Sequence, residues 1–488
     1  MQAAAPPYFK PFPPPRDKAT LAAYLTEAAT LEHQFMCQYL YAAFSLKKQV
    51  DATCSAAQLE VVRRWASQIY MIARQEMEHL SIANSLLTAI GSPPWFGHDN
   101  FPTQSRWYQA AALQHKKLAA SGPDPCDFPF VLQGFGLGVA RRFCCMESPT
   151  LHYVPPQDRA NVIDWCYQSP SGGCPCVPEL PAPPPLARSF LVGLKVPPDT
   201  VEPGTVQELY AAIASGLQYL HSTLGPKALF SGHQSGQSQI PSEYDIYLFS
   251  ICDLETALAG IRLITTQGEG IDAPPGYDSH FQNYYDIAVE FQVMLESDPA
   301  FQPALPLPLN PQPGQYAIPV TAHAVAAFTD GYAALLYMLA GYYANYNPTA
   351  YSQPPYLFQA LEQTVFAPTM TMLIRSLAEL IAQLPADQYG SPAGPPFHLS
   401  SQVLARLSNP TDPIFLDINF HVRNLEPVKR NIERVIDDSD LPPALKPKFE
   451  YVHQNVWRMM ANLQFIYENS IYPKFVNLPS CPQPEGCD

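Results

Sequence analysis

The stretch that decides the fold runs from Val61 to Ile90 and reads VVRRWASQIYMIARQEMEHLSIANSLLTAI. Its apolar residues recur every three or four positions, which predicts a long amphipathic helix. The inward face of this helix carries Val62, Trp65, Ile69, Ile72, Glu76, His79, Ala83, Leu86 and Ile90. Glu76 and His79 therefore lie on the face where a helix normally carries only apolar side chains.

The preceding segment has the same feature. Its inward face carries Leu21, Leu25, Ala28, Glu32, Phe35, Tyr39, Ala42 and Leu46. Burying an unpaired carboxylate costs on the order of several kcal/mol, and neither face includes a lysine or arginine. Two acids that face one core therefore require a cation, and a metal ion is the simplest candidate.

The spacing of Glu76 and His79 suits a shared ion. Three residues on a helix turn through about 300 degrees, so the two side chains project to the same side, one turn apart. A hydrogen-bonded pair inside the core is the alternative for these two residues, and a partly exposed acid beside His33 is the alternative for Glu32. Glu78 lies off the inward face, and we expect it in solvent.

A four-helix metal site needs further ligands from later helices, and the candidates are Glu208, Glu269 and His280. Glu208 has a structural alternative, because Thr205 to Glu208 forms a capping box in which the glutamate caps its own helix. Glu269 and His280 each extend an apolar face, but each could also be an ordinary polar residue at a helix end.

Composition limits the possible functions. The chain has 488 residues with 47% hydrophobic and 12% aromatic residues, which predicts a globular fold with a large core. A net charge of -15 and a pI near 5.2 argue against nucleic acid as a partner. No apolar run reaches about eighteen residues, and the proline-rich start lacks the apolar core of a secretory signal. We therefore expect a cytoplasmic protein that binds no membrane.

Eleven cysteines are scattered through the chain, and six of them fall between residues 126 and 176. Free thiols in a reducing compartment are the favoured interpretation, while local disulfides or a small metal clip remain open.

Helical patterns separated by proline-rich connectors predict an all-α protein. The expected helices span about 18–48, 56–90, 205–224, 244–267, 280–296, 322–346, 355–384, 426–437 and 445–469. Residues 1–17 would be an arm, 18–300 a metal-binding bundle and 301–488 a helical region packed on it. Residues 91–203 are rich in cysteine and proline, with one short helical pattern at about 130–145. We expect this excursion to be irregular and to form a lid, a wall of the active site or a binding surface.

Several separated motifs then resemble a known family. They are Glu32-His33 with Tyr39-Leu40, Glu76-Met77-Glu78-His79-Leu80, Ala83-Asn84-Ser85-Leu86-Leu87, Ala89-Ile90-Gly91, Thr205-Val206-Gln207-Glu208-Leu209-Tyr210, Gln267-Gly268-Glu269-Gly270 with Ser279-His280, and Ala393-Gly394-Pro395-Pro396-Phe397. In this order they resemble the ferritin-like domain of the iminophenyl-pyruvate dimer synthase family, which includes bacterial chromopyrrolate and violacein pathway enzymes. The resemblance covers residues 18 to about 400.

This resemblance implies a ferritin-like four-helix bundle that holds one or two iron ions. The implied ligand positions are Glu32, Glu76, His79, Glu208, Glu269 and His280. It also implies oxidative chemistry, with dioxygen or peroxide as co-substrate, on a small amino-acid-derived or other natural-product intermediate. Iron storage, or a metal-free scaffold with the same fold, are the alternatives. We expect a small-molecule substrate, and a homo-oligomer remains possible. The tyrosines at 39, 70, 210 and 284 could relay electrons or protons, although core packing is their default role.

Overall fold

The computed structural model describes residues 13–103, 130–149, 153–167, 205–232, 246–274, 276–344, 361, 364–410 and 412–469. Within these ranges the regular secondary structure is helical, and the β-type pairing is limited to isolated bridges such as Leu46 with Ala304. The prediction of an all-α protein is therefore confirmed.

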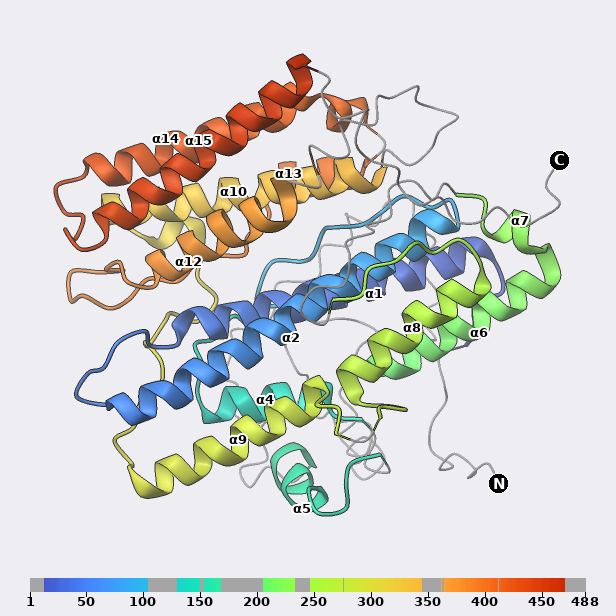
Figure 1. Ribbon diagram of the computed structural model, residues 1–488, viewed down its shortest axis with the longest axis horizontal. Coiled ribbons are helices and arrows are strands. Elements are labelled where there is room, and N and C mark those ends of the chain that lie inside the picture. Colours follow the sequence, from blue (N-terminus) through green and yellow to red (C-terminus); the bar gives the residue numbers. More distant parts are fainter. Residues whose placement is uncertain are drawn as a thin grey trace.

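The two longest helices, α1 (Lys18–Ser45) and α2 (Ala56–Ala89), pack side by side along the centre of the molecule (Figure 1). The Asp17 side chain accepts a hydrogen bond from the Thr20 N–H at 2.8 Å and so fixes the start of α1. A capping box of Ser55 and Gln58 fixes the start of α2. Local sequence thus sets where both helices begin.

Four shorter helices complete the bundle as two pairs. The helix α4 (Leu137–Glu147) packs on α9 (His280–Ser297), and α6 (Val206–Leu224) packs on α8 (Leu254–Glu269). The two pairs cover different stretches of the α1–α2 pair (Figure 1). The end of α4, the start of α6, the end of α8 and the start of α9 meet beside α1 and α2. Helices α1 and α2 provide two members of a four-helix bundle. Each of the other two members is made of two short helices that meet end to end.

The excursion between α2 and α6 contains more regular structure than the sequence predicted. Besides α4 it forms α5 (Arg159–Val162) and a π-helical turn, Ile163–Tyr167. Residues 104–129, 150–152 and 168–204 of the excursion lie outside the described residues, as do residues 1–12 of the expected arm. Helix α8 begins ten residues later than expected, because the Asp253 side chain caps it by accepting from the Thr256 N–H.

The C-terminal helices form a second layer over α1 and α2 (Figure 1). This layer consists of α10 (Pro319–Ala344), a π-helical stretch (Val365–Arg375) that continues into α12 (Ser376–Ile381), α13 (Ser401–Leu407), α14 (Ile418–Asp437) and α15 (Lys446–Asn469). A short helix, α7 (Pro226–Leu229), follows α6. Helices α10 and α12 contact α2 and α1, so the layer closes one side of the bundle.

One described helix is long and apolar enough to cross a membrane when only its length and composition are considered. It is the Pro319–Tyr343 part of α10, and 78% of its most apolar window is buried inside the protein. A helix at the centre of a helical core has this composition because neighbouring helices surround it.

Candidate metal centre

Five side chains from four helices converge where the short helices meet, and we call them the carboxylate–histidine cluster: Glu32 of α1, Glu76 and His79 of α2, Glu147 of α4 and His280 of α9. His79 Nδ1 lies 3.7 Å from Glu32 Oε2 and 3.4 Å from Glu76 Oε2. His280 Nδ1 lies 2.9 Å from Glu76 Oε1 and 3.7 Å from Glu147 Oε2. Glu76 thus belongs to two groups of three ligands, each with its donor atoms within 4.8 Å of one another. This arrangement suits one ion, or two neighbouring ions that share Glu76.

Two glutamines orient the histidines. His79 Nε2 lies 2.8 Å from Gln267 Oε1, and His280 Nε2 lies 3.1 Å from Gln75 Oε1. An amide oxygen only accepts, so each Nε2 carries a proton and each Nδ1 faces the carboxylates. A histidine that ligates a metal through one nitrogen usually donates its other N–H to such a partner.

Glu78 is buried, with 1% of its surface exposed, so the expectation that it lies in solvent is wrong. It accepts a hydrogen bond from Gln267 Nε2 at 3.0 Å and another from the backbone N–H of Tyr247. The residues before α8 and the end of α8 itself pack on this side of α2, which is why a position off the inward face is also covered. Glu78 thus fixes the orientation of the Gln267 side-chain amide, and the oxygen of that amide accepts the hydrogen bond from His79 Nε2.

Glu147 was missed by the sequence analysis, which ended the short helical pattern at about residue 145. A signal was present, because Ala140, Phe143 and Glu147 follow one another at helical spacing. An acid at the end of an apolar stripe is the same pattern that identified Glu32 and Glu76. Glu147 is 6% exposed and lies in the last turn of α4.

The structure separates the two remaining predicted positions. Glu208 forms the capping box that the sequence left open: its Oε2 accepts from the Thr205 N–H at 2.8 Å, and its own N–H donates to Thr205 Oγ1 at 3.2 Å. Glu269 is buried at the end of α8, where its Oε1 accepts from the Gln207 N–H at 3.1 Å. Glu269 also belongs to the described lining of a cavity beside the cluster, whereas Glu208 does not.

A small cavity opens beside the cluster. Its described lining consists of Glu32, Phe35, Glu76, His79, Met146, Glu147, Val206, Gln207, Ile264, Thr265, Gly268 and Glu269, with no lysine or arginine among them. A methyl group added at Gly268 would lie 3.6 Å from Glu147 Oε2, so the backbone of α8 comes close to the carboxylates. The cavity thus combines acidic ligand groups with apolar walls.

Burial and mutual charge shift the pKa values of the cluster. Burial is the main cause that raises the pKa of Glu32 to about 7, with a smaller contribution from Glu76 and opposition from His79. Burial would also raise the pKa of Glu76, but His280 and then His79 hold it below its ordinary value. Burial lowers the pKa of His280, yet Glu76 and Glu147 more than compensate and raise it to about 9. Positive charge is strongly favoured among these carboxylates.

Three buried tyrosines surround the cluster. Tyr210 donates to Glu32 Oε1 at 2.7 Å, and Tyr39 donates to Glu147 Oε1. The hydroxyl of Tyr284 is buried without a hydrogen-bond partner among the described residues. Burial above all, and then the nearby carboxylates, raise the pKa of each phenol well above its usual value. Tyr39 and Tyr210 therefore stay protonated and orient the carboxylates they contact.

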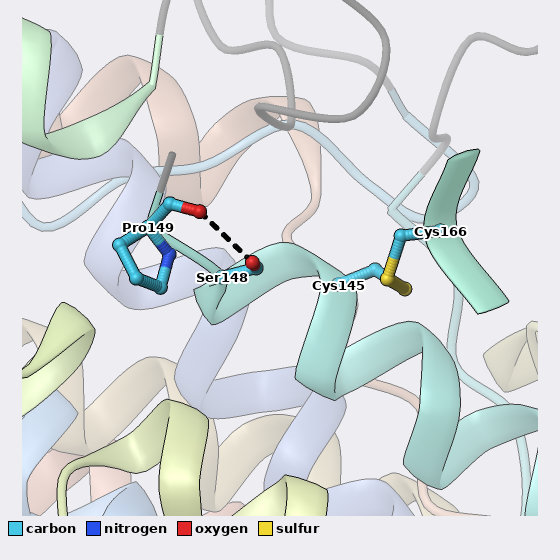
Figure 2. Close-up of a disulfide and its surroundings, with 4 residues drawn as sticks. All are labelled: Cys145, Ser148, Pro149 and Cys166. Atoms are coloured by element: carbon cyan, nitrogen blue, oxygen red, sulfur yellow. Dashed lines mark hydrogen bonds between the residues drawn. A yellow bond between two sulfur atoms is a disulfide. The ribbon is translucent and has the colours of Figure 1, made fainter. Parts of the chain in front are cut away.

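A disulfide lies next to the cluster on α4. Cys145, which lies two residues before Glu147, forms a disulfide with Cys166 (Figure 2). Just beyond, the Ser148 hydroxyl donates to the Pro149 carbonyl at 3.0 Å where the helix ends. Cys37, Cys54, Cys144 and Cys252 are free thiols. The favoured interpretation, free thiols throughout, therefore fails for Cys145 and Cys166, and the disulfide ties α4 to the π-helical turn.

The donor set fits a metal ion. Glu76 Oε2 and Glu269 Oε2 are buried without a hydrogen-bond partner among the described residues, and His280 Nδ1 faces the carboxylates of Glu76 and Glu147. Carboxylates and imidazoles are the ligands that non-haem iron takes in helical bundles, and Glu-x-x-His spacing recurs in such sites. An ion bound here would satisfy the unpartnered atoms and balance the buried negative charge.

Comparisons with known proteins agree with this architecture. A family model described as ferritin-like matches residues 25–289. The 2-imino-3-(indol-3-yl)propanoate dimerase of Chromobacterium violaceum is 27% identical over 79% of this chain and 35% of its own length. The dichlorochromopyrrolate synthase of Lentzea aerocolonigenes is 23% identical over 79% of this chain and 36% of its own length. The chain therefore spans just over a third of the curated relatives that it matches.

A similar solved structure is that of a ferritin-like protein from Caulobacter vibrioides. It is 17% identical, and the alignment covers 72% of this chain and 94% of that protein with a TM-score of 0.42.

Proposed function

Because the chain belongs to the ferritin-like family, we propose that it is an oxidative enzyme that uses iron held by the carboxylate–histidine cluster. Its substrate would be a small amino-acid-derived or related natural-product intermediate, with dioxygen or peroxide as co-substrate. The observation that carries the proposal is the convergence of three buried carboxylates and two buried imidazoles beside a small cavity, with carboxylate oxygens that have no hydrogen-bond partner among the described residues.

Iron would be held by Glu32, Glu76, His79, Glu147 and His280, with Glu269 as a further carboxylate at the cavity wall. Bound iron supplies the redox chemistry with oxygen that no protein side chain provides. The residues around it have their own tasks. Gln267 and Gln75 keep the Nδ1 atoms of the two histidines aimed inward, and Glu78 fixes the Gln267 amide.

The remaining side chains control protons and water. Tyr39 and Tyr210 donate hydrogen bonds to Glu147 and Glu32, which keeps one oxygen of each carboxylate oriented. Phe35, Met146 and Ile264 give the cavity apolar walls that exclude water from the reacting groups. Both effects favour a reaction that must be shielded from solvent.

The substrate class follows from the relatives. One relative is named for dimerising 2-imino-3-(indol-3-yl)propanoate and the other for making dichlorochromopyrrolate. Both names describe compounds with nitrogen heterocycles. We therefore propose an imino acid, or a compound derived from one, as the substrate of this chain.

Two alternatives use the same bundle. An iron-storage protein would take up ferrous iron without turning over an organic substrate, and a metal-free scaffold would take up none. The second structural layer, α10 to α15, and the walled cavity favour an enzyme, because storage needs neither. We also propose a cytoplasmic location, and small molecules rather than nucleic acid or membrane as partners. The burial of α10 supports only the expectation that no membrane is bound.

The test is anaerobic reconstitution of the full chain with Fe²⁺, followed by metal quantitation and exposure to oxygen. Oxygen uptake should depend on added 2-imino-3-(indol-3-yl)propanoate or a related imino acid. Iron binding with oxygen uptake that no imino acid changes would favour storage. Failure to bind iron at all would leave only the scaffold, and the proposal would be wrong.

A further inference from the structure

A second buried cluster lies between α1 and the C-terminal layer. His33 and Cys37 are one turn apart on α1, and His98 lies in the segment that follows α2. Their exposed fractions are 0%, 0% and 2%, and their ligand atoms lie within 4.8 Å of one another. We call these three residues the histidine–cysteine cluster. No carboxylate belongs to it.

The hydroxyl of Tyr332 from α10 reaches all three residues. It lies 2.6 Å from His33 Nε2, 2.8 Å from His98 Nε2 and 3.5 Å from Cys37 Sγ. The two imidazole rings are 4.7 Å apart and nearly perpendicular. Two nitrogens, a sulfur and an oxygen from three parts of the chain thus meet at one buried point.

The hydrogen bonds among these groups cannot all be made. His98 Nδ1 lies 2.8 Å from the Asp99 carbonyl oxygen, which only accepts, so Nδ1 carries the proton and His98 Nε2 is a bare acceptor. A charged imidazole without an acidic partner is costly to bury, so both rings are neutral. The single hydroxyl proton of Tyr332 can go to His98 Nε2 or to His33 Nε2, but not to both.

Either choice leaves one imidazole nitrogen without a donor. If Tyr332 donates to His98, His33 must donate through Nε2, and its buried Nδ1 becomes an acceptor that no described donor reaches, because its backbone neighbour, the Phe96 carbonyl, also only accepts. If Tyr332 donates to His33, His98 Nε2 has no donor. An unsatisfied buried acceptor costs about 1–3 kcal/mol, and a bound cation removes this cost.

The arrangement around His98 is the one that a metal-binding histidine requires. Its Nδ1–H is fixed by a backbone carbonyl, and its Nε2 lone pair points to the cluster. We propose that His33, Cys37 and His98 bind a transition-metal ion of the Zn²⁺ type, with the Tyr332 oxygen as fourth neighbour. Binding releases the Cys37 thiol proton, and small side-chain rotations bring the donors to the usual distances of about 2.0–2.3 Å.

The two clusters would select different ions. A thiolate with two imidazoles suits zinc and other borderline metals, whereas the carboxylate–histidine cluster suits iron. Glu32 and His33 are neighbours in sequence but face different partners, since Glu32 meets α2 and His33 meets α10. This second site is independent of the proposed oxidative function, and its position between the two layers gives it a structural role.

Cobalt tests the proposal, because Co²⁺ bound to a thiolate gives a charge-transfer band in the near ultraviolet and Co²⁺ bound only to carboxylate and imidazole does not. The full chain is stripped with a chelator and incubated to equilibrium with Co²⁺. We expect the thiolate band in the wild type, its loss in Cys37→Ser, and at least about tenfold weaker binding in His98→Gln. Zn²⁺ should displace the cobalt.

Two variants serve as controls. Cys54→Ser removes another buried free thiol and should keep the band. Glu76→Gln disables the carboxylate–histidine cluster and should keep the band as well, so failure of one site is distinguishable from failure of the other. A wild-type protein without a thiolate band, or a band that survives in Cys37→Ser, would overturn the proposal.

A thermal measurement guards against misfolding of the cysteine variant. Zn²⁺ binding to the native state raises its melting temperature. In the Glu76→Gln background, Zn²⁺ should raise the melting temperature, and adding His98→Gln should abolish that rise while circular dichroism remains helical. An equal rise in both proteins would also overturn the proposal.

Discussion

The bundle and the C-terminal layer bury very different side chains. The bundle buries glutamates on α1, α2, α4 and α8, together with His79 and His280. Among the described residues from 301 onward, no Asp, Glu, Lys or Arg is buried, and the buried polar residues are three threonines, His421 and Asn455. His421 there simply contacts the Phe415 carbonyl at 2.9 Å. Helices of similar length pack in the C-terminal layer without internal charge, so helix packing of this kind does not itself require buried acids.

The largest expected effect comes from removing a shared carboxylate. Glu76→Ala should abolish iron binding and lower oxidative activity by more than about 100-fold, because loss of an outer partner alone typically costs 10–100-fold. The metal-free variant should stay helical, since His79 still faces Glu32 and His280 still faces Glu147. Iron per chain, oxygen uptake and circular dichroism measure the three quantities.

His79→Ala is the partner variant and should lose iron in the same way. If both variants keep the wild-type iron content and activity, the assignment of the cluster as the iron site is wrong. The buried charges that distinguish the bundle from the C-terminal layer would then have no role in iron binding.

A core substitution in the C-terminal layer should have the opposite effect, which is a loss of stability without a loss of iron binding. Phe449 of α15 is fully buried, and Phe449→Ala should lower the free energy of unfolding by about 3–5 kcal/mol. The folded fraction of this variant should still bind as many iron ions per chain as the wild type, because no residue of the carboxylate–histidine cluster is changed. Chemical denaturation and metal quantitation provide the two readings.

Phe465, on the same helix, is 55% exposed and is the matched control. Phe465→Ala should change the unfolding free energy by no more than about 0.5 kcal/mol. A loss of bound iron in folded Phe449→Ala protein would show that the two layers are not separable.

Within the bundle, Glu208 tests whether every glutamate near the cluster is a ligand. Its capping contacts with Thr205 predict that Glu208→Ala destabilises the protein by about 1 kcal/mol, as cap removal does elsewhere. The iron content at saturation should stay as in the wild type. Reduced iron stoichiometry would instead make Glu208 a ligand, as the family resemblance implies.

The smallest effect is expected where the two layers meet. Glu379 of α12 accepts hydrogen bonds from Tyr70 of α2 at 2.6 Å and Arg375 at 3.0 Å, and it pairs with Lys48 at 3.3 Å. Burial alone would raise the pKa of Glu379, but Lys48, Tyr70 and Arg375 together hold it below the ordinary value of 4.5. Glu379→Gln should therefore cost about 1 kcal/mol or less at neutral pH.

The sign of the pH dependence follows from the lowered pKa. The folded state binds the Glu379 proton less readily than the unfolded state, so this contribution is fully present above about pH 4.5 and is lost as the pH falls through the folded pKa. Wild type and Glu379→Gln should converge in stability in acid. Glu60→Gln, which affects a 70% exposed carboxylate paired with Arg63, is the control and should change the unfolding free energy by no more than about 0.5 kcal/mol at neutral pH.

Much of the site was visible in the sequence because α1 and α2 are regular. An acid at a predicted inward position, as for Glu32 and Glu76, needs only helical periodicity to be found. Glu147 was missed because its helix stands in an irregular excursion, where the pattern is only three turns long. Glu78 was wrongly expected in solvent because helical periodicity identifies only one buried face. Near Glu78, the helix α2 is covered on more than one side.

The sequence by itself determined the helical class, the positions of α1 and α2 and the inward placement of Glu32, Glu76 and His79, since these depend on local helical periodicity. The tertiary structure decided which later residues join them. It paired Glu147 and His280 across helix ends, committed Glu208 to a cap, joined Cys145 to Cys166 and brought His98 and Tyr332 to His33. Contacts between residues far apart in the chain depend on packing, and no local pattern specifies them.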